Sequence, residues 1–252
     1  MKMINGLKKI FKPFVPSQTR IKIRQIQEKF LGIENEWTGM KNSAVFDKIY
    51  EEGVWGKDPD GISTSGEGSH SDAIITPYIN VISNLLSEIN PTTVVDLGCG
   101  DFNVGKNFVH LAKKYIGCDV SNVILKRNEA KFQSLTNLEF QLLDLSEDVL
   151  PSGDVCFVRQ VLQHLSNNAI DNFVKKLNSE TPYKYLVVTE HLPNNANFAV
   201  NLNKGVGANT RLMIGSGVVL HKAPFNLEVR KITNLLEVNS EGGKIQTILY
   251  EL

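Results

Sequence analysis

The sequence is poor in cysteine and has no long apolar run. Its 252 residues include three cysteines, Cys99, Cys118 and Cys156, at or near the ends of expected core strands. An odd number of such cysteines, at a spacing that fits no zinc motif, indicates free thiols in a reducing compartment. No apolar run reaches the roughly 20 residues that cross a bilayer, and the N-terminus lacks the apolar segment of a secretory signal. We therefore expect a cytoplasmic protein.

The sequence also has no net charge, because 27 Lys and Arg residues balance 27 Asp and Glu residues. The charges are unevenly placed: residues 1–30 hold eight bases and one acid, or +7, which leaves −7 on the rest of the chain. Apolar residues recur at helical spacing in this segment: Ile4, Leu7, Ile10 and Phe11. A basic amphipathic helix of this kind lies on an anionic membrane surface or packs against a partner. The other interpretation is a solvated helical extension. Only a helix on the membrane surface implies peripheral contact of the protein with the inner face of the membrane.

The composition is that of a globular protein, with 42% hydrophobic and 21% charged residues and no internal repeat or low-complexity tract. This length suffices for one large domain with a full core. We expect three segments: a basic helical extension over 1–42, a loop and leading helix over 43–90, and an α/β core over 91–252.

A glycine-rich turn follows an apolar strand near the start of that core. Val94, Val95 and Leu97 surround Asp96 and lead into Gly98-Cys99-Gly100-Asp101, and a helix is expected from about Gly105. Glycines after a parallel strand let the backbone approach a ligand closely, and the next helix points its free N–H groups at the same crevice. The segment therefore predicts a nucleotide-like ligand.

The two acids of the turn distinguish between ligands. A dinucleotide fingerprint requires a third glycine where this chain has Asn103. Asp96 and Asp101 would repel a pyrophosphate, whereas they would attract a ligand that carries an ammonium and a sulfonium. The pattern D-x-G-C-G-D resembles motif I of the class I S-adenosylmethionine (SAM) methyltransferases, and Asp96, Gly98, Gly100 and Asp101 are the residues that we expect to bind SAM.

Further acids follow at the spacing of β/α units. Asp119 ends an apolar run 21 residues after Gly98, where a carboxylate accepts hydrogen bonds from ribose hydroxyls. The resemblance implies that Asp144, after the next strand, contacts the adenine amino group. It also places the segment 154–165, with Arg159, beside the cofactor.

The order of elements predicts a mostly parallel, doubly wound sheet. Strands are expected near 93–97, 115–119, 138–143, 154–159, 184–189 and 243–252, with helices that include 72–86 and 168–177. The resemblance implies a Rossmann-like α/β fold of seven strands in which the last strand is antiparallel.

A loop rich in Gly and Ser precedes the helix at 72–86. Such a loop in a compact domain is functional or disordered. Its position suggests that the loop, which includes His70, forms a lid over the cofactor crevice. We expect Ser65 and Trp55 to contact the cofactor. Tyr50 and Trp55 would stack on adenine or cap the substrate pocket.

Residues 45–252 resemble a bacterial group of class I methyltransferases that are often encoded with surface-polysaccharide genes. The pieces that match are Tyr50…Trp55-Gly56…Ser65-Gly66-Glu67-Gly68-Ser69, Asp96–Asp101, Tyr115–Asp119, Arg159–Leu165, Arg211 and Pro224-Phe225. One departure is Gln160, where the group's pattern predicts an acid. The resemblance implies a sugar, a sugar nucleotide or a related glycan intermediate as the methyl acceptor.

Transfer to a hydroxyl needs a base, because the acceptor must lose its proton. The candidates are His164, after the fourth strand, and Glu190 and His191, after the fifth, since ligands of open α/β sheets bind outside the carboxyl ends of the strands. Arg211 is a candidate for gripping a phosphate or carboxylate of the substrate, and His221 is a more distant substrate contact. No group of side chains has metal-ligand spacing, so we expect no metal dependence.

Other acceptors remain open at this point. An N-methyltransferase for a small amine or an amidino sugar would need no strong base. A nucleic-acid methyltransferase recruited by the basic segment is disfavoured, because the body is acidic and no Asn-Pro-Pro-Tyr-type tetrapeptide follows the fourth strand. We therefore expect a small-molecule or glycan acceptor and no nucleic acid; a SAM-binding module without catalysis is a lesser alternative. The sequence does not indicate the oligomeric state.

Overall fold

A seven-stranded sheet runs through the computed structural model, which describes Trp37 and residues 39–252. The strand order is β3-β2-β1-β4-β5-β9-β8. The strands are β1 (Thr93–Leu97), β2 (Lys114–Asp119), β3 (Leu138–Leu142), β4 (Gly153–Arg159), β5 (Tyr183–Pro193), β8 (Lys231–Ser240) and β9 (Gly243–Glu251). β1 to β5 are parallel, and β9 is antiparallel to both of its neighbours. This topology confirms the predicted Rossmann-like methyltransferase sheet and its antiparallel last strand.

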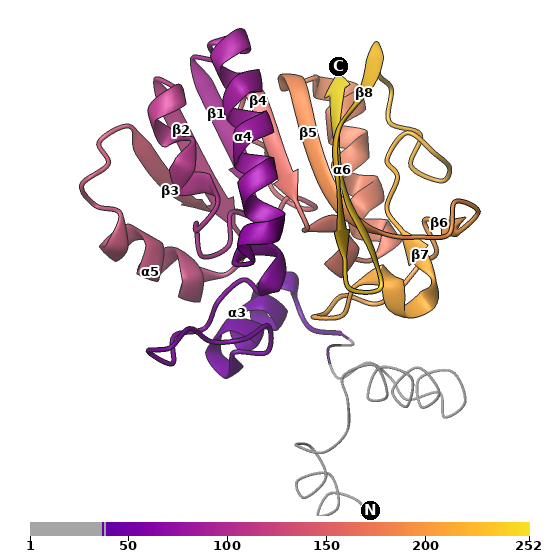
Figure 1. Ribbon diagram of the computed structural model, residues 1–252, viewed down its shortest axis with the longest axis horizontal. Coiled ribbons are helices and arrows are strands. Elements are labelled where there is room, and N and C mark those ends of the chain that lie inside the picture. The colour runs from indigo at the N-terminus through magenta and orange to yellow at the C-terminus, as the bar shows by residue number, and fades with distance from the viewer. Residues whose placement is uncertain (1–36, 38) are drawn as a thin grey trace, which may run out of the picture. The chain divides into compact units, whose positions relative to one another are not determined.

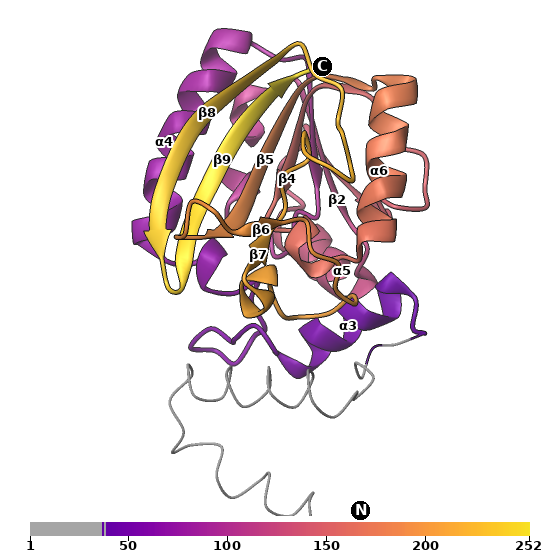
Figure 2. The ribbon, with the colours of Figure 1, turned by 90° about the vertical axis from the view of Figure 1, so that its right-hand side faces the viewer.

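Helices cover both faces of the sheet. Figure 2 shows α4 (Asp72–Ile89) on one face and α6 (Asn167–Glu180) on the other. α5 (Asn122–Lys131) connects β2 to β3 and contacts α3, and Phe132 at its end packs in the same core cluster as α4. The buried residues of α4 recur every four positions (Ile74, Tyr78, Ile82 and Leu86), so that one stripe of the helix packs on the sheet. α3 (Asn42–Glu52) lies beyond the carboxyl ends of the parallel strands, at the lower end in Figure 1.

Phe102 anchors the glycine-rich turn in the core. Its ring is fully buried and meets the rings of Tyr115, Phe132 and Phe140 edge-on, at centroid distances of 5.6, 5.2 and 5.1 Å. Such edge-to-face pairs add about 0.5–1.5 kcal/mol each to the burial of the rings. The residue has a left-handed backbone (φ 59°), which this packing maintains.

The helix expected from Gly105 was a wrong prediction. Two 3₁₀ turns take its place, η2 (Gly105–Asn107) and η3 (Val109–Leu111). The Asn107 amide donates to the carbonyls of Asn103 and Val104, at 3.2 and 2.9 Å, and such bonds compete with the α-helical pattern. The crevice therefore has no α-helix N-terminus after the turn.

The segment between β5 and β8 contains little regular structure. It holds the short strands β6 (Ala199–Val200) and β7 (Ser216–Gly217), which pair in parallel, and one 3₁₀ turn, η5 (Arg211–Ile214). The loop before α4 has one short turn, η1 (Glu67–Ser69). Both segments lie near the carboxyl ends of the parallel strands (Figure 1).

Residues 39–252 form one compact unit. The basic segment 1–30 and its expected amphipathic helix lie outside the described residues. In the part of the chain that the structure describes, no helix is long and apolar enough to span a membrane.

Candidate active site

The glycine-rich turn folds back over the end of β2. Gly98 and Cys99 donate their N–H groups to the carbonyl of Cys118, at 2.8 and 2.9 Å. Gly98 (φ 77°) and Gly100 (φ 57°) both have left-handed backbones, which explains the need for glycine here. A Cβ on Gly100 would also lie 2.4 Å from the Ser65 hydroxyl oxygen, so the close approach of the lid depends on its absence.

Asp119 and Asp96 are the buried acids beneath this turn. Asp119 accepts hydrogen bonds from the N–H groups of Gly100 (3.0 Å) and Ser121 (2.9 Å), and burial raises its pKa to about 6. Asp96 accepts from the Tyr115 hydroxyl at 3.0 Å, and burial raises its pKa to about 7. A positively charged ligand would relieve the cost of charging both carboxyls. The pair therefore fits a cationic nucleoside.

Asp144 follows β3 and is held by the start of α3. It accepts hydrogen bonds from the side-chain amide of Asn42 (2.9 Å) and from the N–H and hydroxyl of Ser146 (2.9 and 2.7 Å). The opposite side of α3 is attached to α5, where Asp47 accepts from Ser121 and Val123 at 2.7 and 3.1 Å. α3 therefore lies against the predicted adenine and ribose acids.

Residues 53–71, which we call the lid, are fastened to the glycine-rich turn at Asp101. Ser65 and Asp101 exchange two hydrogen bonds of 2.8 Å, each from a backbone N–H to a side-chain oxygen. The His70 Nε2 lies 2.6 Å from the same carboxylate, and the Tyr50 hydroxyl lies 3.0 Å from the Ser65 hydroxyl. These contacts place the lid over the turn.

Arg159 fastens the same end of the lid from the sheet. At the carboxyl end of β4, its guanidinium donates to the Gly68 carbonyl (2.6 Å) and the Ser69 hydroxyl (3.2 Å). The group lies 4.8 Å from the centroid of the Tyr78 ring on α4, a cation–π contact that orients it. The role of Tyr78 was not predicted, because in the sequence it is one more residue of a buried helix stripe.

Trp55 joins the lid to the insertion after β5. Its indole N–H donates to the Ala208 carbonyl at 3.1 Å. Its ring lies 5.0 Å from the His164 ring and 5.4 Å from the Tyr50 ring. Of the two expected roles for Trp55, this placement favours a cap on the substrate pocket.

His164 lies in η4 (Leu162–His164) with both ring nitrogens engaged. Nδ1 is 3.2 Å from the Gly207 carbonyl, which can only accept, and Nε2 is 3.2 Å from the Gln163 amide nitrogen. Burial lowers the pKa of the ring to about 3. These contacts argue against the prediction that His164 is a catalytic base.

Glu190 is also unsuited to act as a base. Its side chain is 2% exposed, and Oε1 accepts from the Leu162 N–H at 3.1 Å. Burial raises its pKa to about 8, so the carboxyl is largely neutral at pH 7. As a residue next to His191 on a strand, it points to the opposite face of the sheet.

His191 retains the properties of a base at the crevice. Its side chain lies on the same face of the sheet as that of Thr189, two residues earlier in β5. Thr189 pairs with Arg159, which is bonded to the lid, so His191 lies on the lid side just beyond the end of β4. Burial lowers the pKa of its ring, which keeps the imidazole neutral. Its Nε2 is buried and has no hydrogen-bond partner among residues 39–252.

The structure does not support Arg211 and His221 as substrate contacts. Arg211 is fully buried, and its guanidinium donates to the backbone carbonyls of Leu202 and Leu165. His221 contacts the Tyr250 hydroxyl at 3.1 Å, and Tyr250 pairs with Leu186 in the amino-terminal half of β5, away from the crevice. Long-range folding of the insertion, which the local sequence does not reveal, decides both placements.

Gln160 was missed as a possible site residue. It has a left-handed backbone (φ 55°), and its N–H donates to the Thr189 carbonyl at 2.6 Å. A Cβ on Gly68 would lie 2.3 Å from the Gln160 side chain, so this residue packs directly under the lid. The sequence signal was its departure from the expected acid.

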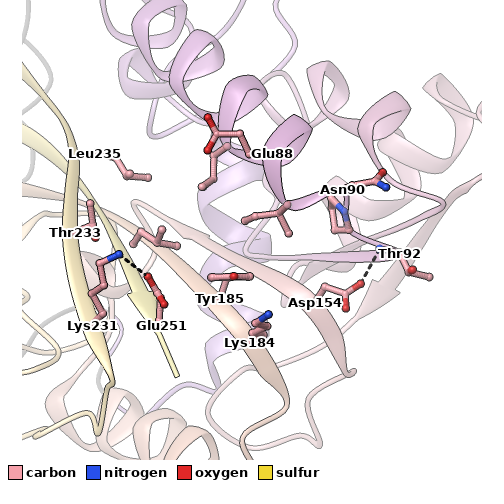
Figure 3. A pocket seen from close by; sticks show the side chains of 14 residues that line it. Glu88, Asn90, Thr92, Asp154, Lys184, Tyr185, Lys231, Thr233, Leu235 and Glu251 are labelled. Carbon is pink, nitrogen blue, oxygen red and sulfur yellow. Dashed lines mark hydrogen bonds and ion pairs between the residues drawn. The ribbon is translucent and has the colours of Figure 1, made fainter.

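A cavity of about 580 Å³ lies elsewhere, at the amino ends of the strands. Figure 3 shows Asn90, Thr92, Lys184 and Lys231 around it, with Lys231 paired to Glu251 at 3.1 Å. Its lining residues include none of the candidate site residues. The described residues also include no cluster of His, Cys, Asp and Glu that could hold a metal ion.

Residues 94–179 match the sequence model of a methyltransferase domain family. No curated protein gives a significant match. Among solved structures, human N-acetylserotonin methyltransferase in complex with SAM has a TM-score of 0.58 at 14% identity, over 93% of this chain and 67% of that one. The N-methyltransferase NodS from Bradyrhizobium japonicum WM9, in complex with S-adenosyl-L-homocysteine, has a TM-score of 0.55 at 14% identity, over 82% and 98%.

A third structure is the N-terminal domain of EvdMO1, solved in the presence of S-adenosyl-L-homocysteine and D-fucose. It has a TM-score of 0.50 at 13% identity, over 85% of this chain and 98% of that one. At these identities the three structures establish the fold. The methyltransferase domain matched over residues 94–179, together with this fold, supports a SAM-dependent methyltransferase with S-adenosyl-L-methionine as its cofactor, as the sequence predicted.

Proposed function

We propose that this enzyme methylates a hydroxyl group of a sugar, a sugar nucleotide or a related intermediate of a cell-surface glycan. The sugar rests on the resemblance of residues 45–252 to methyltransferases encoded with surface-polysaccharide genes. The hydroxyl rests on His191, whose neutral ring has a free buried nitrogen at the carboxyl end of β5. EvdMO1, crystallised with D-fucose present, has a similar fold.

The acids of the crevice would hold the cofactor. When bound, S-adenosyl-L-methionine would supply an activated methyl group on a sulfonium. Asp119 would accept hydrogen bonds from the ribose hydroxyls, and Asp144 from the adenine amino group. Asp96 and Asp101 would favour the positive charges of the methionine end. Arg159 and Ser65 keep the lid in place over these groups, which excludes water from the reaction.

The remaining catalytic requirement is alignment and removal of one proton. Methyl transfer is an in-line displacement, so most of the rate comes from holding the acceptor oxygen against the methyl group. His191 would take the hydroxyl proton at Nε2. General-base assistance of this kind contributes typically 10²–10⁴-fold.

The experiment is methyl transfer from labelled SAM to fractionated sugar nucleotides and lipid-linked glycans, compared between wild type, His191→Ala and His221→Ala. His221 is the matched control, because it is a histidine bonded to Tyr250 and distant from the crevice. We expect a labelled methyl ether, a loss of at least 100-fold for His191→Ala and near wild-type rates for His221→Ala. Full activity of His191→Ala would contradict hydroxyl transfer by this route.

A small amine is the second candidate acceptor. It is favoured by the finding that two of the three candidate bases are unsuited to the task, since His164 is held on both nitrogens and Glu190 is largely neutral. A neutral amine attacks with its own lone pair and needs no strong base. A labelled N-methyl product, formed at equal rates by wild type and His191→Ala, would select this function.

A further inference from the structure

Residues 201–211, which we call the strap, cross over η4 and are bonded to its backbone. The Gly207 N–H donates to the His164 carbonyl at 3.0 Å, and the His164 ring contacts the Gly207 carbonyl in return. The Asn167 amide donates to the Asn201 carbonyl at 2.8 Å. The strap and η4 therefore form one wall beside the crevice.

Arg211 closes the strap onto this wall. One terminal nitrogen donates to the Leu202 carbonyl at the start of the strap, and the other donates to the Leu165 carbonyl, just after η4, at 2.7 Å. A planar guanidinium can make both bonds at once, which an ammonium cannot do with the same geometry. The side chain is fully buried, so the two bonds are shielded from water.

Glu190 supports the same wall from the sheet. Its Oε1 accepts from the Leu162 N–H at the start of η4. The charge of Arg211 favours the ionised form of this carboxyl and so opposes the effect of burial. The two side chains form no ion pair within 4.0 Å in the described residues, so each acts mainly through the backbone that it holds.

The lid rests on this wall through Trp55. The carbonyl that accepts the indole N–H belongs to Ala208 in the strap, and the indole ring packs against His164 in η4. Both partners of Trp55 are thus positioned by the contacts of Arg211 and Glu190. The acids that are expected to hold the cofactor, Asp96, Asp119 and Asp144, make none of these bonds.

We propose that Arg211, assisted by Glu190, is a positioning residue that sets the wall of the acceptor pocket formed by the strap, His164 and Trp55. Neither side chain touches the reacting atoms. The inference rests on the proposed transfer of a methyl group to an acceptor in this pocket. Loss of Arg211 should therefore weaken binding of the acceptor and leave binding of the cofactor unchanged.

The test compares Arg211→Met and Arg211→Lys with Arg230→Met, a matched control at an exposed arginine. Hydrogen exchange of the SAM-bound full chain requires no knowledge of the acceptor. We expect at least 10-fold faster exchange of the Gly207 amide and its neighbours in Arg211→Met, with the Gly98 and Cys99 amides unchanged. Arg211→Lys should give an intermediate rate, because it restores the charge and one bond, and Arg230→Met should match wild type.

Kinetics provide the readout that distinguishes positioning from general stability. With the acceptor identified in the labelling experiment, Arg211→Met should raise the KM for the acceptor at least 10-fold while the SAM affinity from calorimetry stays within twofold. Unchanged exchange over 201–211 would overturn the proposal, and so would uniform loosening or misfolding of the whole chain. If no sugar or amine is methylated, the proposed function fails, whereas hydrogen exchange and SAM affinity still decide the role of Arg211.

Discussion

Ser65 and Asp101 exchange backbone-to-side-chain hydrogen bonds of 2.8 Å in both directions. This pair connects a loop that precedes the sheet to the glycine-rich turn 36 residues later. Each bond satisfies a backbone N–H that would otherwise lie partly buried without a partner, which costs about 1–3 kcal/mol. The lid and the turn are therefore parts of one site.

Gly100→Ala should prevent the lid from docking. The new Cβ would lie 2.4 Å from the Ser65 hydroxyl oxygen and 3.2 Å from the Tyr50 hydroxyl, at a backbone with φ 57°. We expect SAM affinity measured by calorimetry to fall at least 100-fold. Gly242→Ala is the control, because its φ is 76° and a Cβ there meets only Leu212 at 3.8 Å. Equal SAM affinities for the two variants would contradict the close-packed lid.

Asp119→Ala should abolish SAM binding in the same calorimetric assay. The substitution removes the expected ribose acceptor and leaves the N–H groups of Gly100 and Ser121 without their carboxylate. Asp58→Ala is a suitable control, because among the described residues the Asp58 carboxylate of the lid accepts hydrogen bonds only from the N–H groups of its own turn. Retention of wild-type affinity by Asp119→Ala would remove the ribose assignment.

Glu190→Gln should make the stability of the protein less dependent on pH. Burial raises the pKa of Glu190 from 4.5 to about 8, so the folded state holds this proton more tightly than the unfolded state. The contribution of Glu190 to stability is then complete below about pH 4.5 and is lost as the pH rises through about 8. Urea unfolding between pH 5 and 9 checks this. Between pH 5 and 9, the free energy of unfolding should fall by about a few kcal/mol more for wild type than for Glu190→Gln. If this free energy depends on pH in the same way for both proteins, the carboxyl is already charged in the folded protein.

Deletion of residues 1–30 should weaken binding to anionic vesicles and leave SAM affinity unchanged. The segment carries a charge of +7, and each basic residue near an anionic surface contributes about 1 kcal/mol. Sedimentation with phosphatidylserine-containing vesicles, with neutral phosphatidylcholine vesicles as the control, measures the difference. If the full chain and the deletion variant bind equally, the basic segment has no role at a membrane.

Most of the fold was predictable because its signals are local. Apolar strands that run into Asp96, Asp119 and Arg159 alternate with helical stretches, and strands of this kind are typical of a parallel sheet that is covered on both faces. The missing helix after Gly105 was not predictable from that alternation. There, the Asn107 side chain competes for backbone carbonyls over a short connection between β1 and β2.

The sheet and the cofactor follow from the sequence alone, because their signals are residues at fixed distances along consecutive β/α units. Which candidate side chains face the crevice depends instead on long-range packing. His164, Glu190 and Arg211 are buried in bonds to backbone groups up to 46 residues away, and His191 is left with a free nitrogen. Such contacts depend on how the strap, the lid and η4 pack together, because most buried polar groups are bonded to whatever partners the fold brings near them.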